Sequence, residues 1–191
     1  MNQNILLDSK DKEIISLLNA NPKISQEKIA EKIHLSQPSV AVRIRKLIEK
    51  GFINHLIGMN PSKLGLHIAK IEITTRNPSK ILEMFSECPF FINGFTVSGK
   101  NNLCLLFIAE NISSLESIVD IHLRTDIDVL NIDFNIIISS NKEFITPIKL
   151  NIKKEKKTPC GIEEKCGKCI CYKRKNCLGC PTLNSYRGIF W

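Results

Sequence analysis

The sequence predicts an α+β chain of three parts, in the order helical, mixed and cysteine-rich. Helical periodicity dominates before Gly51, strand and helix patterns alternate from about residue 66, and six of the eight cysteines fall between Cys160 and Cys180. We therefore expect a helix-turn-helix domain over residues 1–60, a β-α-β-β-α-β domain over 66–150, and a basic linker with a cysteine-rich tail over 151–191.

The helix-turn-helix is predicted from capping residues and buried stripes. Ser25 and Ser36 each stand just before an apolar helical pattern, where a serine hydroxyl can accept a hydrogen bond from an unpaired amide of the first turn. Gly51 follows the second pattern and can take the positive φ that ends a helix. An earlier helix over Ser9–Ala20 is expected to pack behind these two, and residues 52–59 are expected to form a short strand that serves as a wing.

The exposed side of the helix after Ser36 carries small polar residues followed by cations. A helix of this kind suits duplex DNA, with its front against base edges and its flanks against phosphates. A solvated helix face with ion pairs is the alternative, which charge alone would favour, but the capped helix-turn-helix favours DNA. We predict that bases are contacted by Ser36, Gln37, Ser39 and Arg43, and phosphates by Arg45, Lys46 and Lys50.

The net charge of +8 is concentrated at the two ends of the chain. Residues 1–64 hold ten basic and six acidic residues (+4), residues 65–150 hold seven and ten (−3), and residues 151–191 hold ten and three (+7). This pattern favours a polyanion bound by the ends and a self-associating or ligand-binding middle. No apolar run approaches ~20 residues and no secretory signal is visible, so we expect a soluble, cytoplasmic protein without a membrane partner.

The middle of the chain predicts a ferredoxin-like sheet. Strand patterns cover residues 67–75, 90–97, 103–109 and 127–138, and helices are expected after Ser79 and after a cap at Ser113 or Ser114. Helices would cover one face of the sheet, so a homodimer or higher oligomer is the simplest cover for the other. The last strand is expected to point five apolar residues inward, and two cysteines are expected to be core residues: Leu130, Ile132, Phe134, Ile136 and Ile138, with Cys88 and Cys104.

The tail predicts metal or redox chemistry. Two C-x-x-C pairs, Cys166/Cys169 and Cys177/Cys180, can each turn two thiolates onto one ion, and four thiolates fit a closed zinc site. Neighbouring lysines favour the thiolate form. Cys160 and Cys171 are left over as additional candidate ligands. An iron–sulfur cluster and a metal-free dithiol switch remain alternatives to zinc.

Several motifs resemble the leucine-responsive regulator/AsnC (Lrp/AsnC) family of transcription regulators over about residues 4–140. They are L-D-x-x-D-x-x-I-I from Leu7 to Ile15, I-A at Ile29–Ala30, L-S-x-x-x-V from Leu35 to Val40, and R-I-x-K-L-x-x-x-G-x-I from Arg43 to Ile53. The resemblance implies a winged helix-turn-helix and a βαββαβ (RAM-type) domain for dimerisation and effector binding. The tail lies outside it.

The resemblance also implies a small-molecule effector site at the turn that usually reads G-D-x-D. Here Gly99 is kept, while Lys100 and Asn102 stand where the family prefers acids. Gly99 and Asn102 are the candidate effector residues. Because an amide is no fixed negative partner for an ammonium group, we do not expect an ordinary amino acid as effector.

Two other functions were compatible with the same domain pattern. A haem-synthesis enzyme resembling siroheme decarboxylase would need cationic or imidazole groups in its second domain, yet this domain is net acidic and its histidines are His67 and His122. An interaction module that no longer binds DNA is the third alternative. The sequence therefore predicts a non-enzymatic, DNA-binding transcription regulator.

Overall fold

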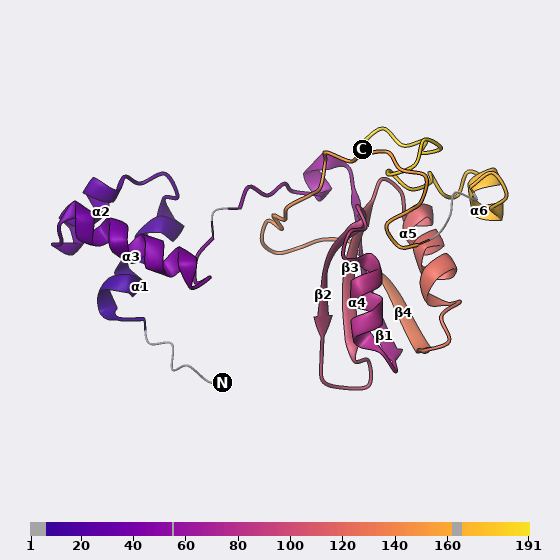
Figure 1. Ribbon diagram of the computed structural model, residues 1–191, viewed down its shortest axis with the longest axis horizontal. Helices are drawn as coiled ribbons and strands as arrows, with labels where there is room; N and C mark the ends of the chain where they lie inside the picture. The colour runs from indigo at the N-terminus through magenta and orange to yellow at the C-terminus, as the bar shows by residue number, and fades with distance from the viewer. Residues whose placement is uncertain (1–6, 55, 162–165) are drawn as a thin grey trace. The chain divides into compact units, whose positions relative to one another are not determined.

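The computed structural model describes residues 7–54, 56–161 and 166–191 (Figure 1). The chain forms two compact units, residues 1–56 and residues 57–191. The cysteine-rich tail is part of the second unit. Among the described residues, no helix is long and apolar enough to span a bilayer.

The first unit contains three helices, α1 (Ser9–Ala20), α2 (Gln26–Ile33) and α3 (Gln37–Glu49). Ser25 and Ser36 cap α2 and α3 as predicted, and His34 takes a left-handed conformation (φ 55°) at the corner between them. Apolar side chains from all three helices form one core: Ile14, Ile29, Ala30, Ile33, Val40, Ile44 and Leu47. The predicted helix-turn-helix is confirmed.

The strand predicted over residues 52–59 is wrong for the described residues of that range. Its backbone forms a single bridge, in which the Met59 and Thr146 amides each donate to the other's carbonyl at 2.8 and 3.0 Å. Ile57 is 93 % exposed, so the segment has no buried face to hold a longer strand in register.

The second unit is built on a four-stranded antiparallel sheet. Its strands are β1 (His67–Thr75), β2 (Phe91–Thr96), β3 (Leu103–Ala109) and β4 (Val129–Ile137), in the order β2-β3-β1-β4. Helix α4 (Pro78–Phe85) joins β1 to β2, while α5 (Ile112–Ile118) and the π-helical turn η2 (Val119–Leu123) join β3 to β4. A short 3-10 turn, η1 (Ser62–Leu64), precedes β1. This is the predicted β-α-β-β-α-β fold.

Three details differ from the prediction. Asn111, not Ser113 or Ser114, caps α5, because its side chain accepts from the Ser114 amide. Leu130 is 58 % exposed, because the β1–β4 register shifts between Thr74 and Thr75 and Val129 takes the paired position. Ile138 lies just past the end of β4 and is 96 % exposed.

The two faces of the sheet are covered by different parts of the chain. Helices α4 and α5 lie on one face of the sheet (Figure 1). Their side chains and those of η2 form a core there that includes Ile71, Phe85, Phe107 and Leu115. The opposite face is covered at one end by the chain itself, since Phe144, Ile148, Phe190 and Trp191 pack against Leu66, Ile68 and Ile108. Cys104 pairs with Glu72 on this opposite face and is half-buried, so the prediction that it is a core residue is wrong.

The tail docks on the second unit through its aromatic end. Glu110, at the end of β3, accepts hydrogen bonds from the Tyr186 hydroxyl and from the amides of Ile189 and Phe190. Trp191 Nε1 donates to the Lys149 carbonyl at 3.1 Å. The aromatic end of the tail therefore packs on the second unit beside the sheet.

Candidate nucleic-acid interface and thiol site

The front of α3 is shaped by hydrogen bonds among its polar residues. The Ser36 hydroxyl accepts from the Ser39 amide, and the two hydroxyls lie 2.8 Å apart. Gln37 Nε2 donates to Gln26 Oε1 of α2 at 3.3 Å. All three side chains are exposed. Helix α2 therefore helps to orient the end of α3 on which base contacts were predicted.

Arg43 is held by α1. Its guanidinium forms ion pairs with Asp8 at 2.6 Å and with Asp11 at 2.7 Å. Asp8 and Asp11 also form the capping box of α1. The Asp11 amide and then Arg43 keep the pKa of Asp8 below its usual value of 3.8, and the two carboxylates raise the pKa of Arg43. The base contact of Arg43 stays a prediction, and in this conformation Arg43 ties α3 to α1.

The three predicted phosphate-binding cations are exposed. In the part of the chain that the structure describes, Arg45, Lys46 and Lys50 form no ion pair, unlike Arg43. Lys46 and Lys50 follow Ser39 at helical spacing, so they lie on one flank of α3 with it. Unpaired cations beside exposed hydroxyls can meet a phosphate backbone without first breaking an intramolecular bond.

Sequence reasoning missed an apolar contribution to this surface. Val42 is 44 % exposed on the solvent side of α3, three residues from Arg45, while Val40 and Ile44 are buried. An exposed valine at the centre of such a helix can contact a thymine methyl group. Its spacing against the buried stripe was the signal that could have identified it.

The turn with the candidate effector residues is held by backbone contacts. The Asn102 side chain accepts from the Thr75 amide at 2.9 Å and donates to the Thr75 carbonyl at 2.7 Å. Gly99 takes φ +132°, which favours glycine. These bonds fix the β2–β3 hairpin to the end of β1. The effector-binding role of Gly99 and Asn102 stays a prediction.

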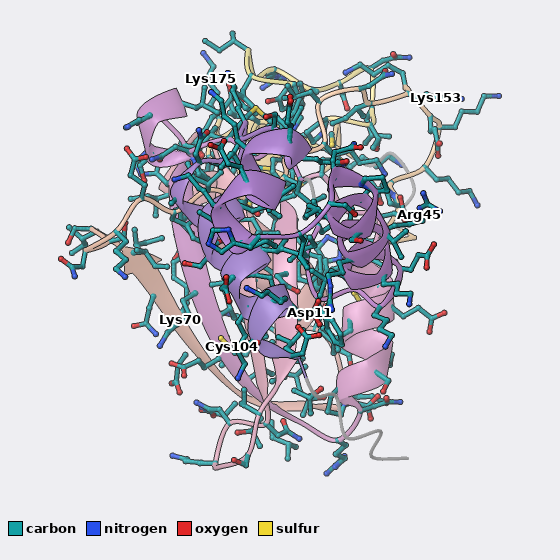
Figure 2. The ribbon with its side chains drawn as sticks, turned by 90° about the vertical axis from the view of Figure 1, so that its left-hand side faces the viewer. Asp11, Arg45, Lys70, Cys104, Lys153 and Lys175 are labelled. Carbon is teal, nitrogen blue, oxygen red and sulfur yellow. The ribbon has the colours of Figure 1, made fainter. Side chains whose placement is uncertain are left out.

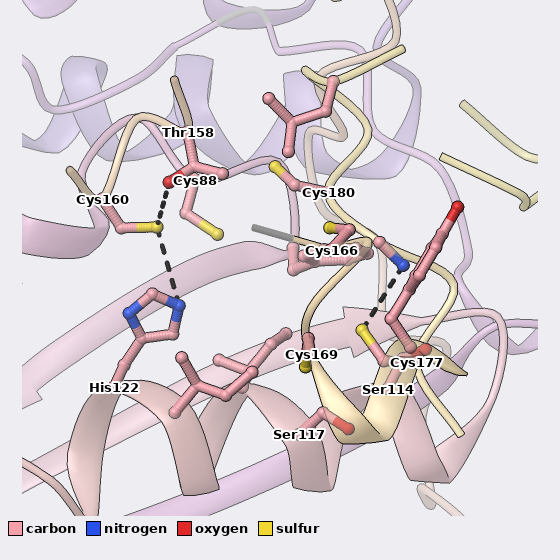
Figure 3. A pocket seen from close by; sticks show the side chains of 16 residues that line it. Cys88, Ser114, Ser117, His122, Thr158, Cys160, Cys166, Cys169, Cys177 and Cys180 are labelled. Atoms are coloured by element: carbon pink, nitrogen blue, oxygen red, sulfur yellow. Dashed lines mark hydrogen bonds between the residues drawn. The ribbon is translucent and has the colours of Figure 1, made fainter. Parts of the chain in front are cut away.

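Five of the six tail cysteines line one cavity of about 290 Å³ (Figure 3). They are Cys160, Cys166, Cys169, Cys177 and Cys180. The cavity lies between the tail and the α5–η2 segment, which contributes Ser114, Ile118 and His122. Cys171 lies in the short helix α6 (Ile170–Lys173) and does not line the cavity.

Several tail sulfurs already have hydrogen-bond partners. The Gly179 amide donates to Cys177 Sγ at 3.3 Å, and Gly179 takes φ +85° to present that amide. Cys180 Sγ lies 3.2 Å from the Thr182 hydroxyl. Burial raises the pKa of both Cys177 and Cys180. Because burial and the neighbouring cysteines both raise these pKa values, these two thiols hold their protons unless a cation displaces them.

Among the cavity residues from outside the tail, one histidine and one cysteine have side chains that can bind metals, and neither was predicted as part of the site. His122 Nε2 lies 3.6 Å from Cys160 Sγ, and burial lowers the pKa of His122 to about 4. Cys88 is a buried core residue, as predicted, but its side chain also lines the cavity. No sequence spacing links these residues to the tail, because they follow α4 and α5 and are brought there by the fold.

Comparison with known proteins agrees with this architecture. A family model described as winged helix-turn-helix DNA-binding matches residues 7–54. The transcriptional regulator AzlB of Bacillus subtilis is 24 % identical over 149 residues, which is 74 % of this chain and 95 % of that protein. The proline dehydrogenase transcriptional activator of Rhodobacter capsulatus is 34 % identical over 103 residues, 47 % of this chain and 67 % of that protein. The chain belongs to the Lrp/AsnC family of transcription regulators.

Solved structures of Lrp/AsnC proteins share the fold. Escherichia coli AsnC is superimposed with a TM-score of 0.64 at 18 % identity, over 73 % of this chain and 97 % of that one. Bacillus subtilis LrpC is superimposed with a TM-score of 0.60 at 24 % identity, over 72 % of this chain and 99 % of that one. The chain is thus a DNA-binding transcription regulator of the Lrp/AsnC type. The relatives compared are named transcription regulators, so the predicted absence of enzymatic function is supported and the siroheme-decarboxylase alternative is not.

Proposed function

We propose that this Lrp/AsnC regulator binds duplex DNA as a homodimer through α3, and that the thiol site in its tail modulates that binding. The observation that supports the DNA-binding surface is one flank of α3. There Lys46 and Lys50 form no ion pair with any residue that the structure describes and lie near Ser39, with Arg45 and Val42 close by. A helix that recognises bases in the major groove needs cations that contact phosphates and polar or apolar side chains that contact base edges. This flank offers the lysines, the serine hydroxyl and the valine for these contacts.

The uncovered part of the sheet supports a dimer. Lys70, Glu72, Cys104 and Leu106 lie on the face opposite α4 and α5, and Phe95, paired with Cys104, is 46 % exposed there. Figure 2 labels Lys70 and Cys104 of this face. Lys70 is already paired with Glu72 of its own strand at 2.8 Å, so a two-fold contact would bring a neutral pair to the interface and would cover Phe95. We therefore propose this face for the self-association predicted from the fold.

A substitution on this face tests the dimer. Leu106→Arg should convert the full chain from dimer to monomer in sedimentation equilibrium, because a cation would be buried without a partner. Ile127→Arg is the matched control, since Ile127 is 84 % exposed in the turn before β4. A Leu106→Arg chain that sediments like the unsubstituted chain would refute this interface.

The DNA target follows from the same symmetry. Two α3 helices related by a two-fold axis prefer an inverted repeat, with half-site centres about one helical turn (10–10.5 base pairs) or a multiple apart. Selection from a random duplex pool should enrich such repeats. Enriched sequences without two-fold symmetry would contradict dimeric binding while leaving DNA binding intact.

A path of contacts supports modulation by the tail. Leu178, between Cys177 and Cys180, donates its amide to the buried Ser114 hydroxyl of α5 at 3.2 Å. The aromatic end of the same tail bonds Glu110 and the Lys149 carbonyl. Lys149 lies three residues after Thr146, which pairs with Met59.

Met59 lies three residues after Leu56, the last residue of the first unit. A change at the thiol site can therefore alter the segment that leads to the DNA-binding unit. Cysteine thiolates are ligands of zinc, the ion expected from the spacing of the tail cysteines, and also of iron–sulfur clusters.

A further inference from the structure

The arrangement of the tail cysteines differs from that of a closed zinc site. Four thiolates on one zinc lie about 3.8 Å from one another, as Zn–S bonds of ~2.3 Å and tetrahedral geometry require. Here five cysteines surround a cavity of about 290 Å³. Among the described residues, no three cysteine, histidine or acidic side chains stand close enough together to hold a single metal ion. The sulfurs thus enclose a space several atoms wide.

The walls of this cavity do not suit water. A volume of about 290 Å³ corresponds to roughly ten water molecules at ~30 Å³ each. Phe90, Ile118, Ile121 and Leu183 form much of the lining and offer no hydrogen bonds. A ligand that bonds to thiolates and is otherwise in contact with apolar side chains fits this lining better than a chain of waters does.

We propose that the cavity holds a four-iron, four-sulfide cluster ligated by Cys166, Cys169, Cys177 and Cys180. This inference rests on the proposed function and names the cofactor of its modulating site. A cluster of this class takes four cysteine thiolates, and the two C-x-x-C pairs approach the cavity from the two sides of α6 along the chain. Figure 3 shows Cys166 and Cys169 between Cys160 on one side and Cys177 on the other in that view.

Cys160 differs from the proposed ligands in that its sulfur lies close to a histidine ring. The Gly179 amide donates to Cys177 Sγ, and the Thr182 hydroxyl lies against Cys180 Sγ, which are the bonds that tune a cluster's thiolates. Cys160 Sγ instead lies between the Thr158 hydroxyl at 3.1 Å and His122 Nε2 at 3.6 Å. Cys160 and His122 thus form a separate pair in the cavity wall beside the cluster.

Reconstitution of the full chain tests this assignment. Anaerobically purified protein is stripped with a chelator and then supplied with equal amounts of ferrous and ferric iron and with sulfide, which together balance to a cluster of charge 2+. A parallel sample receives cobalt(II) as a spectroscopic probe of zinc sites. We expect about four iron and four sulfide per chain with a brown chromophore. Cys177→Ser should lower bound iron to less than a quarter of that value, and Cys171→Ser, the matched control outside the cavity lining, should leave it unchanged.

Two results would overturn the cluster. One is about one tetrahedral cobalt per chain with no retained sulfide, which would mean that the thiols close onto a single ion. The other is binding of neither metal with reversible disulfide formation, which would mean a dithiol switch. DNA affinity measured on the same samples keeps the two proposals separate. A metal-dependent affinity without a cluster refutes only the cluster, whereas a cluster without any effect on affinity refutes only the modulation.

Discussion

Lys46 and Lys50 on α3 give the sharpest prediction for DNA binding. Replacing both by alanine removes two exposed cations that have no ion-pair partner among the described residues. Each lost phosphate contact lowers the slope of log K against log salt by about 0.9. The slope of log K against log salt should therefore become less steep in the double variant, by about 1.8 per DNA-binding unit and by about 3.6 for a dimer with both units on DNA.

The loss of affinity follows from the same slope. Because the electrostatic contribution vanishes near 1 M salt, a slope of ~0.9 corresponds to roughly eight-fold in affinity per contact at 0.1 M. Fluorescence anisotropy of a selected duplex, titrated at several salt concentrations, measures both quantities. Arg124→Ala is the control, since Arg124 directly follows η2 and pairs with Asp120 of that turn. An unchanged slope in the double variant would refute the placement of the phosphates along α3.

Three further predictions concern stability and coupling. Ile29 is fully buried, so Ile29→Ala should lower the free energy of unfolding of the first unit by about 2–5 kcal/mol in urea titrations followed by helical signal, while the 93 % exposed Ile57→Ala should have almost no effect. Asp8 has a lowered pKa, so its ionised form stabilises the fold above pH 3.8 and this contribution is lost as the pH falls below that value. Thermal unfolding should show a constant difference between the unsubstituted chain and Asp8→Asn from pH 5 to 7, and a narrowing difference below pH 3.8. Trp191→Ala removes the bond to the Lys149 carbonyl and three aromatic contacts, so amide hydrogen exchange at Thr146 should accelerate.

A different result would contradict each of these three predictions. A small effect of Ile29→Ala would mean that the helical core repacks around the cavity. A pH-independent difference for Asp8→Asn would mean that the carboxylate is not held by Arg43 in solution. Unchanged exchange at Thr146 would break the proposed path between the tail and Met59.

Local signals predicted the helices well because their ends are decided by neighbouring residues. Ser25 and Ser36 cap α2 and α3 through hydroxyls three residues from the amides that they bond. The prediction of the wing strand is wrong because a strand needs a partner strand. The described residues of this segment form one bridge, between Met59 and Thr146, which is far along the chain. The prediction that Leu130 points inward is wrong for a similar reason, because a bulge in the pairing of β4 with β1 decides which face of the sheet Leu130 lies on.

The site shows the same division between local and distant information. The C-x-x-C spacing indicated the thiol cluster, yet the cavity that the thiols share is completed by His122 and Cys88, which follow α5 and α4. The ion pairs of Arg43 with α1 were equally hidden, because no spacing relates Asp8 and Asp11 to a residue on α3. Both the lining of the cavity and the ion pairs of Arg43 depend on tertiary packing, which cannot be deduced from the spacing of residues in one sequence.

The account depends most on coupling between the thiol site and DNA binding. The direct measurement is the dissociation constant of the full chain for its selected duplex, with the site loaded and then stripped, under anaerobic conditions. We expect a change of at least about five-fold, the lower end of typical allosteric coupling, and its loss in Cys177→Ser but not in Cys171→Ser. Equal dissociation constants for loaded and stripped protein, with the change in metal content verified, would contradict the account.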